Sequence, residues 1–489
     1  MKNRHWMRML ALLLAAVLTL GLCGCSMPPQ PPAATQAPDP VEPADQTSPE
    51  PAAEPAVEPA EGPVAEETAE PVEEPAEAPV EEPAPEEIPD DGSWETLVDE
   101  DGDGIILYVF NYKGSTVHAL IVLDPSRVFV GTALPEPNAY GQGITLDMML
   151  EQYGAVAGIN AGGFKDEKGI GDGWPPSGIT ISRGIVFEGE EYGPIVGLDD
   201  KDQMWTGHYD LNDCKNVSIR DTVSFGPWLV SEGVKADAAQ METGIGARSA
   251  IGQRADGSVV LVTIDGRQGY SIGVTFADCI DIMADKLGCV DAANLDGGNS
   301  TCMMYNGEMI GRSANKAGGT RYLPDAWLVE ALPEDYVRPE GVPDQVRLPA
   351  NALGEQREYV GECTDEQKER MYTFAWIFSR AYYAYFGSSN SDRYYPEFVA
   401  FTKPESELRY RAELALMDRL WVNTWKTEPD NIVVDGAYVN PDGSYDILIT
   451  LDVTEYSGYW TYVAKGIHLR ITVVDDPVGP VGLRAIATN

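Results

Sequence analysis

The hydrophobic pattern of residues 105–134 predicts β-strands. β-Branched and aromatic residues recur through "IILYVFNYKGSTVHALIVLD" (105–124) and "RVFVGTAL" (127–134), with Lys-Gly and Asp-Pro turns at the ends of the apolar runs. The pattern returns in "SAIGQRADGSVVLVTIDGR" (249–267), where Ala-Asp-Gly separates two apolar runs. Because Asp-Gly is typical of tight hairpin turns, this segment is predicted to form two antiparallel strands.

One helix is predicted to follow this hairpin. Thr275 is a suitable N-cap, Asp278 stands three residues later as in a capping box, and Gly288 is a typical stop. The apolar stripe between them consists of Phe276, Ile280, Met283, Ala284 and Leu287. The helix separates a strand that ends at Asp265 from a segment that ends at Asp296, so both loops are expected to open at the same end of a sheet.

The C-terminal part has helices first and strands afterwards. Thr364 with Gln367 begins a strong helical pattern, and a second helix is predicted near residues 405–425. Strand-like runs follow at 431–439, 445–453, 459–474 and 481–487. The chain is therefore predicted to be α+β. It has a mixed or antiparallel sheet domain with few helices over residues 93–332, and a small domain of two helices and an antiparallel sheet over residues 361–489.

Two stretches interrupt these patterns. Residues 25–92 are rich in Pro, Glu and Ala, and between 27 and 91 there is no Lys, Arg or aromatic residue. Such a stretch buries too little apolar surface to fold, so it is predicted to be a disordered stalk, which at ~3.1 Å per residue reaches roughly 200 Å. Residues 333–360 lack periodicity and are predicted to be a linker.

The first 25 residues have the composition of a bacterial lipoprotein signal. A basic start precedes an apolar run over 9–20, and Leu22, Gly24 and Cys25 then resemble a lipobox. Residues 1–24 are therefore expected to be a signal peptide and Cys25 to be lipidated; a plain cleaved signal is the alternative. The first interpretation predicts an extracellular protein on the bacterial cell surface, anchored to the membrane by lipid.

The overall charge and the metal-ligand patterns narrow the classes of partner. A formal net charge of -44 without a basic cluster argues against nucleic acid. With 4 histidines and no HExxH, zinc hydrolases are disfavoured. The acidic "DEDGDGI" (99–105) matches the start of a calcium loop, but Phe110 stands where Glu is needed, so an acidic turn is favoured. Neither a metal nor a cofactor is predicted.

Polar residues and glycines occur at the ends of several apolar runs. Asp, Arg and Asn would cost free energy there if they were buried without partners, so as a set they indicate a binding site. The candidate residues are Asp296, Asp265, Arg248, Arg267, Arg321, Asn160, Asn294, Gly297, Gly298 and Ser300. The glycines allow a ligand to approach backbone N–H groups, which bind anions.

Seven motifs in this order resemble the phosphodiester glycosidase family, which includes the lysosomal N-acetylglucosamine-1-phosphodiester α-N-acetylglucosaminidase. They are "GINAGGF", "GPWLV", "ARSAIG", "DGSVVLVTIDGR", "TFADCIDIMADKLGC", "AANLDGGNSTCM" and "RYLPDAWLV". The resemblance covers about residues 105–330. Two positions depart from the family: Asn299 replaces a usual glycine or serine, and Gly163 replaces a common aromatic residue, with Phe164 next to it.

The resemblance implies hydrolysis of the bond between C1 of a sugar and a phosphodiester oxygen, which releases free sugar and a phosphomonoester. Asp296 and Asp265 suit the carboxylate roles of nucleophile and base, whose assignment stays open. Arginines suit a phosphate clamp because a guanidinium binds phosphate through two hydrogen bonds. The expected partner is a phosphorylated glycan or other sugar phosphodiester.

Two other functions remain open. The first is a glycan-binding or envelope-assembly lipoprotein that retains the fold without turnover, because Asn299 and Gly163 both lie in expected site loops. The second is a metal-dependent phosphodiesterase that cuts the P–O bond. The sequence assigns no role to the domain at 361–489.

Overall fold

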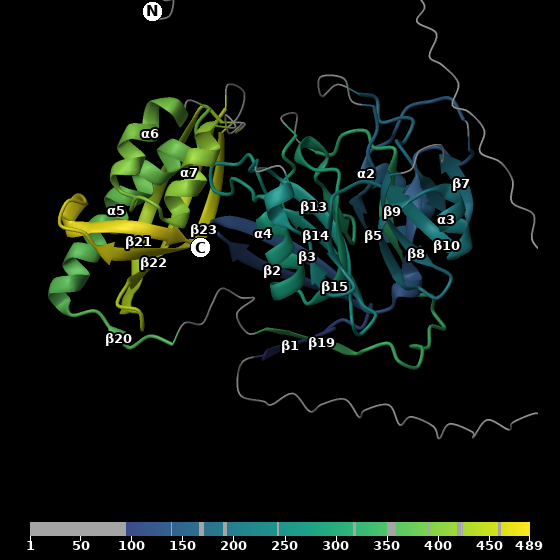
Figure 1. The fold of residues 1–489 in the computed structure, drawn as a ribbon, viewed down its shortest axis with the longest axis horizontal. Helices are drawn as coiled ribbons and strands as arrows, with labels where there is room; N and C mark the ends of the chain where they lie inside the picture. The colour runs from purple at the N-terminus through teal and green to yellow at the C-terminus, as the bar shows by residue number, and fades with distance from the viewer. Residues whose placement is uncertain are drawn as a thin grey trace, which may run out of the picture. The chain divides into compact units, whose positions relative to one another are not determined.

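The computed structural model of the chain describes residues 94–137, 139–165, 171–188, 193–241, 244–315, 319–349, 358–389, 391–417, 422, 424–457 and 461–489 (Figure 1). The signal peptide, the lipidation site Cys25 and the stalk that the sequence predicts lie outside the described residues. Among the residues described, no helix combines the length and the apolar character needed to cross a membrane.

The first domain contains a sheet that includes the predicted hairpin and the strands predicted over residues 105–124. Its strands run in the order β12 (Val234–Lys235), β11 (Trp228–Ser231), β15 (Cys289–Leu295), β13 (Arg248–Arg254), β14 (Val259–Ile264), β3 (Ser115–Val122), β2 (Ile105–Tyr112). β2 pairs with β3, and β13 pairs with β14, both in antiparallel register. The predicted hairpin of β13 and β14 is therefore confirmed, as are the strands predicted before and after Lys113-Gly114, which also form a hairpin.

Two further sheets of this domain have five strands each. One has the order β17 (Glu308–Ile310), β16 (Met303–Tyr305), β5 (Ala155–Asn160), β18 (Asp325–Glu330), β4 (Val128–Thr132). The other has the order β7 (Ile185–Glu188), β6 (Thr180–Ser182), β10 (Ile219–Ser224), β8 (Gly193–Asp199), β9 (Met204–Tyr209). Alternate residues of β3 face different layers: Ile121 lies in the core that includes the helix after β14, whereas Leu120 packs with Val130 and Trp327 of the second sheet.

The helix predicted after β14 is α4 (Phe276–Asp281), which continues as a π-helical turn, Ile282–Lys286. The predicted capping box is present, since the Thr275 side chain accepts from the Asp278 N–H and the Asp278 side chain accepts from the Thr275 N–H. Phe276, Ile280 and Leu287 are buried against the sheet, as the apolar stripe predicts. Local capping chemistry therefore starts this helix where the sequence places it.

Short elements join the layers. The helices are α2 (Leu146–Tyr153) and α3 (Leu211–Asn216), and the 3-10 turns are Pro125–Arg127, Ala238–Gln240 and Gly298–Ser300. β1 (Trp94–Val98) pairs with β19 (Gln345–Pro349), and Val346 and Leu348 of β19 are fully buried. Part of the segment predicted as a linker is thus a strand that packs into the core of the first domain.

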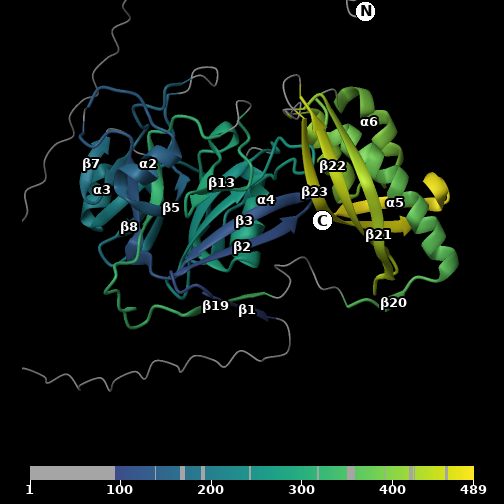
Figure 2. The ribbon, with the colours of Figure 1, turned by 180° about the vertical axis from the view of Figure 1, so that it is seen from behind.

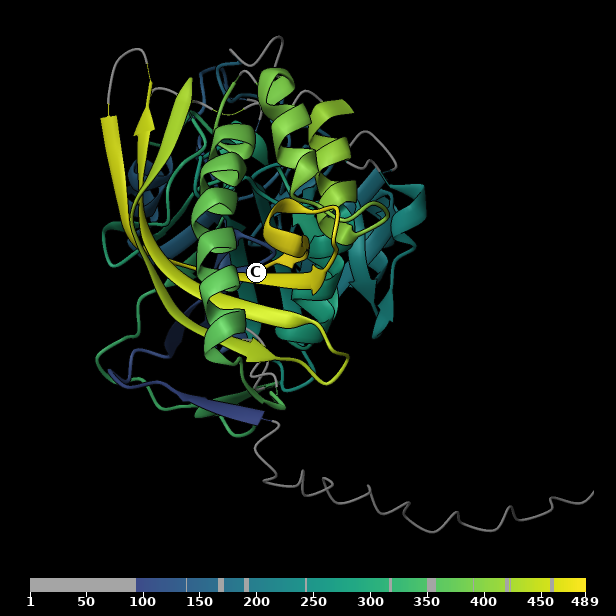
Figure 3. The ribbon, with the colours of Figure 1, turned by 90° about the vertical axis from the view of Figure 1, so that its left-hand side faces the viewer.

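The C-terminal domain has helices on one face of an antiparallel sheet. The helices are α5 (Asp365–Phe386), α6 (Ser391–Ala400) and α7 (Glu407–Met417), and a 3-10 turn, Pro480–Gly482, follows later. The sheet has the order β20 (Gly361–Glu362), β21 (Lys426–Val439), β22 (Tyr445–Tyr456), β23 (Thr461–Asp475), β24 (Leu483–Thr488). Figures 2 and 3 show β21, β22 and β23 side by side, with α5 across one face of the sheet.

The predicted fold class is confirmed, with one addition. Every ladder between the named strands is antiparallel. The predicted α5 and its capping box at Thr364 are present, and α7 lies within the second predicted helix. Helix α6 was not predicted, because Pro396 lies inside it and its sequence is largely polar.

Candidate active site

Asp296 and Asp265 follow two strands that run in the same direction. β14 and β15 are both antiparallel to β13, so their carboxyl ends lie at the same edge of the sheet. Leu295 pairs with Ser249, which places Asp296 beside the start of β13. The prediction that both loops open at one end of a sheet is therefore confirmed.

The side chain of Arg267 reaches the glycine loop after Asp296. Its Nη1 donates to Asn299 Oδ1 over 2.6 Å, and a Cβ on Gly298, where φ is +60°, would lie 2.8 Å from Nη2. Burial lowers the pKa of Arg267, the charge of Arg248 lowers it further, and the charge of Asp296 raises it. The guanidinium thus lies directly on the glycine backbone, within the electrostatic field of both other charges.

Arg248 begins β13, and its side chain is held in place by backbone and ring contacts. Nη2 donates to Gly244 O over 2.6 Å and Nε donates to Val274 O over 3.3 Å. The guanidinium carbon lies 4.0 Å from the ring centroid of Phe276. A Cβ on Gly297 would lie 3.8 Å from Arg248 Cα. The glycine loop therefore passes directly beside this strand.

Asn160 ties together the strands that carry the site. Its Oδ1 accepts from Ser249 Oγ over 2.7 Å and from the Cys302 N–H over 3.1 Å, while Nδ2 donates to Asp296 O. Asn160 is fully buried. These contacts make it a positioning residue for the backbone of Asp296, because its amide oxygen is already occupied by two donors.

Asn294 and Ser300, two other predicted site residues, are buried on either side of Asp296. Asn294 Nδ2 donates to Gly226 O over 3.0 Å, which ties β15 to the "GPWLV" segment. Ser300 ends the 3-10 turn, and its N–H donates to Gly297 O over 3.1 Å. Both residues therefore support the loop that carries Asp296.

Asp265 belongs to a separate cluster of contacts. It is buried, and its Oδ1 accepts from the Arg312 N–H over 3.1 Å. Its Oδ2 lies 3.4 Å from His118 Nε2 and accepts from Tyr270 Oη over 3.3 Å. A Cβ on Gly311, where φ is +72°, would lie 2.6 Å from Asp265 Oδ1. These contacts place the carboxylate against the loop at 311–312.

Arg321 lies in the segment that precedes β18. Its guanidinium carbon is 4.7 Å from the ring centroid of Phe164. The neighbouring Gly163 has a nearby ring as well, since a Cβ there would lie 3.2 Å from Phe225. The ring of Phe225 therefore lies directly beside the backbone of Gly163.

Asp325 is a site residue that the sequence analysis missed. It is fully buried, Oδ1 accepts from the Gly162 N–H over 2.6 Å, and Oδ2 accepts from Thr180 Oγ1 over 3.4 Å. Burial raises the pKa of Asp325 to about 7; these two hydrogen bonds oppose the shift and the charge of Asp296 adds to it. An acid at the start of an otherwise apolar strand, "DAWLV", is the sequence signal that could have identified it.

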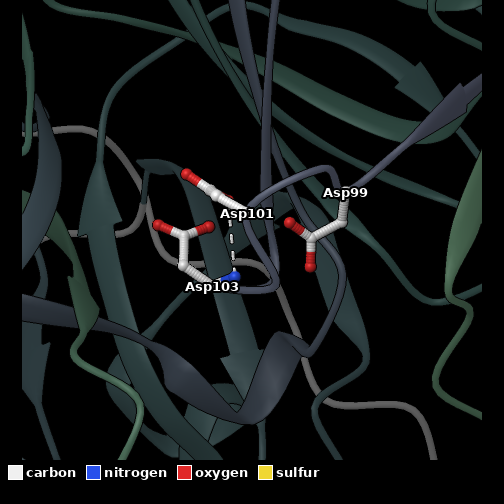
Figure 4. Close-up of side chains that lie close together, drawn as sticks. All are labelled: Asp99, Asp101 and Asp103. Carbon is white, nitrogen blue, oxygen red and sulfur yellow. Dashed lines mark hydrogen bonds between the residues drawn. The ribbon is translucent and has the colours of Figure 1, made fainter.

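The carboxylates of the acidic turn at 99–103 lie close together (Figure 4), and they accept hydrogen bonds from backbone N–H groups of the same turn. Asp99, Asp101 and Asp103 each offer an oxygen within 4.8 Å of the others. However, Asp99 accepts from the Gly102 and Gly104 N–H groups, and Asp103 accepts from the Ile105 N–H over 2.9 Å. The favoured interpretation as an acidic turn agrees with these internal hydrogen bonds.

Comparison with known proteins supports the family resemblance. Residues 153–330 match the family model described as phosphodiester glycosidase. The uncharacterized SPbeta prophage-derived protein YomE of Bacillus subtilis (strain 168) is 29% identical over 201 residues, which cover 38% of this chain and 29% of the relative. The chain therefore spans less than a third of that relative's length. The match of the family model confirms the resemblance predicted from the seven motifs.

Two solved structures are similar at low identity. The catalytic domain of zebrafish N-acetylglucosamine-1-phosphodiester alpha-N-acetylglucosaminidase, auto-inhibited by its pro-peptide, has 18% identity and a TM-score of 0.40, covering 49% of this chain and 88% of that chain. A hypothetical protein from Synechocystis has 15% identity and a TM-score of 0.36, covering 46% of this chain and 62% of that chain.

Proposed function

We propose that the chain, whose residues 153–330 match the phosphodiester glycosidases, hydrolyses a sugar-1-phosphodiester at the C1–O bond. The observation that carries the proposal is the arrangement of Arg248 and Arg267 around the glycine loop of Asp296. Two guanidinium groups beside a glycine backbone suit a phosphate, and a carboxylate suits the anomeric carbon.

In this reaction the arginines hold the phosphodiester and stabilise the charge that develops on the leaving oxygen. The C1–O bond breaks, its electron pair stays on the phosphate oxygen, and the oxygen of water ends on C1 of the free sugar. Because the leaving group is a stabilised anion, Asp296 is needed near C1 more than a strong acid is needed at the phosphate. Asp296 acts there as nucleophile or as base for water.

A defined substrate panel tests the proposal. N-acetylglucosamine-1-phosphodiesters and related sugar phosphodiesters are incubated with the protein, and free reducing sugar is measured. Asp296→Asn and Arg248→Ala are expected to abolish the release of sugar. Asp281→Asn is the matched control, because Asp281, the last residue of α4, makes a half-exposed ion pair with Lys235 of β12.

The position of bond cleavage separates the proposal from its rivals. In water labelled with ¹⁸O, C1–O cleavage places the label in the sugar, whereas P–O cleavage places it in the phosphate. Label in the phosphate, together with loss of activity in a chelator, would favour a metal-dependent phosphodiesterase. Glycan binding without turnover on the whole panel would favour a glycan-binding lipoprotein on the same fold.

We further propose that the substrate is a cell-envelope or extracellular glycan reached from a lipid anchor. The lipobox-like sequence at Cys25 and the Pro/Glu/Ala-rich segment after it support this placement. Expression of the full chain in a bacterial host, followed by detergent phase partition, tests it. Wild type is expected in the detergent phase and Cys25→Ala in the aqueous phase; equal partition of both would contradict the anchor.

A further inference from the structure

A carboxylate of the C-terminal domain is inserted against the loop that carries Arg267. Glu455 lies on β22, and its side chain is fully buried. Oε1 accepts from the Gly269 N–H, and the Tyr270 N–H is a second backbone donor to this carboxylate. Oε2 pairs with Arg312 Nη1. The carboxylate thus joins two loops of the first domain to β22 of the C-terminal domain.

The loop fits this strand without room for a side chain. A Cβ on Gly269 would lie 2.4 Å from Thr427 Oγ1 and 3.0 Å from Glu455 Oε1. Gly269 has an ordinary backbone conformation, since its φ is not positive. Glycine is therefore required here by the close approach of β21 and β22, rather than by the shape of the turn.

The same loop carries Arg267 and contacts Asp265, two of the predicted site residues. Arg267 stands two residues before Gly269, has φ of +61°, and donates its N–H to Ile272 O over 3.3 Å. Tyr270 Oη donates to Asp265 Oδ2 over 3.3 Å. The residues that hold Glu455 thus closely follow Asp265 and Arg267, two residues of the candidate active site, along the same loop.

Arg312 provides the second connection. Its side chain pairs with Glu455 and stacks on Tyr462, with 3.9 Å between the guanidinium carbon and the ring centroid. Its backbone N–H donates to Asp265 Oδ1. Burial raises the pKa of Glu455, and the ion pair with Arg312 opposes this shift. A buried carboxylate persists only with such partners, so the contact is specific.

We propose that Glu455 is a positioning residue: it fixes the loop 266–273 so that the Arg267 guanidinium is held over the glycine loop of Asp296. The C-terminal domain then completes the phosphate-binding side of the site. The part of this inference that concerns catalysis rests on the proposed glycosidase function, whereas the part that concerns the loop does not.

Hydrogen–deuterium exchange on the full chain tests the loop independently of activity. Glu455→Gln is expected to accelerate exchange of the amides of 268–272 at least tenfold, because Gln keeps the shape but loses the charge that holds Arg312. The amides of β13 and β14 are expected to exchange as in wild type. Unchanged exchange in the loop, or equal acceleration in β13, would overturn the proposal. Glu428→Gln, a half-exposed ion-pair partner on β21, is the matched control.

Kinetics then separate positioning from loss of folded protein. Glu455→Gln is expected to raise KM for the sugar phosphodiester about tenfold, whereas partial unfolding would lower the apparent kcat and leave KM unchanged. In an Arg267→Ala background the same substitution should raise KM no further, because the group that it positions is gone. Additive effects would overturn the proposal. Absence of turnover by wild type contradicts only the glycosidase function, and the exchange result still decides the role of Glu455.

Discussion

Two aspartates of the first domain have paired cations nearby but differ in their surroundings. Asp278, on α4, is buried; Oδ1 pairs with Lys113 Nζ and Oδ2 with Arg411 Nη1, each over 2.8 Å. Asp296 follows β15 in a glycine loop and shares the electrostatic environment of Arg248 and Arg267. Charge balance alone therefore does not distinguish a structural carboxylate from a catalytic candidate.

The backbone around each carboxylate makes the distinction. Asp278 also accepts from the Thr275 N–H over 2.9 Å as part of the capping box, so its oxygens bind groups of the protein itself. Burial opposes its ionisation, but Arg411 and Lys113 outweigh burial and hold the pKa of Asp278 at about 2. Two glycines follow Asp296 but not Asp278, and because they have no side chains, Arg267 and the start of β13 approach the backbone there closely.

The largest expected effect comes from replacing each of the two aspartates by asparagine: one substitution should lower activity and the other should lower stability. Asp296→Asn is expected to lower kcat/KM for a sugar phosphodiester by roughly 10³-fold, because it removes the group near C1. Asp278→Asn should leave kcat/KM of the folded fraction within about threefold and instead lower the unfolding midpoint. Substrate kinetics and urea unfolding of both variants check this; a stability loss without an activity loss in Asp296→Asn would remove the distinction.

Replacement of Arg411, the buried cation that pairs with Asp278, tests the structural role of Asp278. Arg411→Met keeps the volume but leaves the buried Asp278 with Lys113 alone, so the free energy of unfolding is expected to fall by about 3 kcal/mol. Arg370→Met is the matched control, since Arg370 pairs with Asp475 at the surface of the same domain and should cost at most about 1 kcal/mol. Urea titrations measure both; similar losses would show that the buried pair has no special role.

Asp325, near Asp296, and Asp278 should contribute to the free energy of unfolding with opposite dependence on pH. Asp325 beside Asp296 has a folded pKa of about 7, above its unfolded value, so its contribution to stability is complete below about pH 4. That contribution is lost as the pH rises, roughly 2 kcal/mol between pH 5 and pH 7. Asp278 has a lowered pKa, so its contribution persists in this range and is lost only as the pH falls toward about 2.

Unfolding of wild type and Asp325→Asn at pH 5 and pH 7 measures this effect. The stability advantage of wild type over the variant is expected to shrink as the pH rises, because Asn cannot ionise. A constant difference across this range would show that Asp325 is ionised throughout. Asp281→Asn, which alters a half-exposed residue, serves as the control substitution.

The sequence predicted those features whose causes are local. The capping boxes at Thr275 and Thr364 and the Asp-Gly hairpin each depend on a few neighbouring residues, and all are present. The position of the Asp265 and Asp296 loops at one edge of the sheet also followed, because a single helix lies between the two strands that carry them. Local chemistry and strand direction together were sufficient for the main loops of the site.

Features that depend on distant pairing were missed. β19 has only two buried apolar positions and is stabilised by β1, far away in the sequence, so periodicity could not identify it. In the sequence Asp325 looks like any strand residue, because its hydrogen bond from the Gly162 N–H forms only in the folded chain. The contact of Glu455 with Gly269 joins two domains, and neither residue carries a signal of it alone.

The smallest expected effect tests whether the glycine loop is specialised. Asn299 Oδ1 accepts from Arg267, and this contact exists because the chain has Asn where the resemblance predicts glycine or serine. Asn299→Ser shortens the acceptor, so Arg267 gains freedom to bind substrate while losing its fixed orientation. KM for the preferred substrate should rise about threefold, the cost of one weakened charge-assisted hydrogen bond, with kcat unchanged. If Asn299→Ser instead broadens the range of sugars that are hydrolysed, Asn299 selects the substrate. If neither KM nor this range changes, the loop of Asp296 does not depend on the contact between Asn299 and Arg267. The surroundings of Asp296 and Asp278 then differ in the glycines alone.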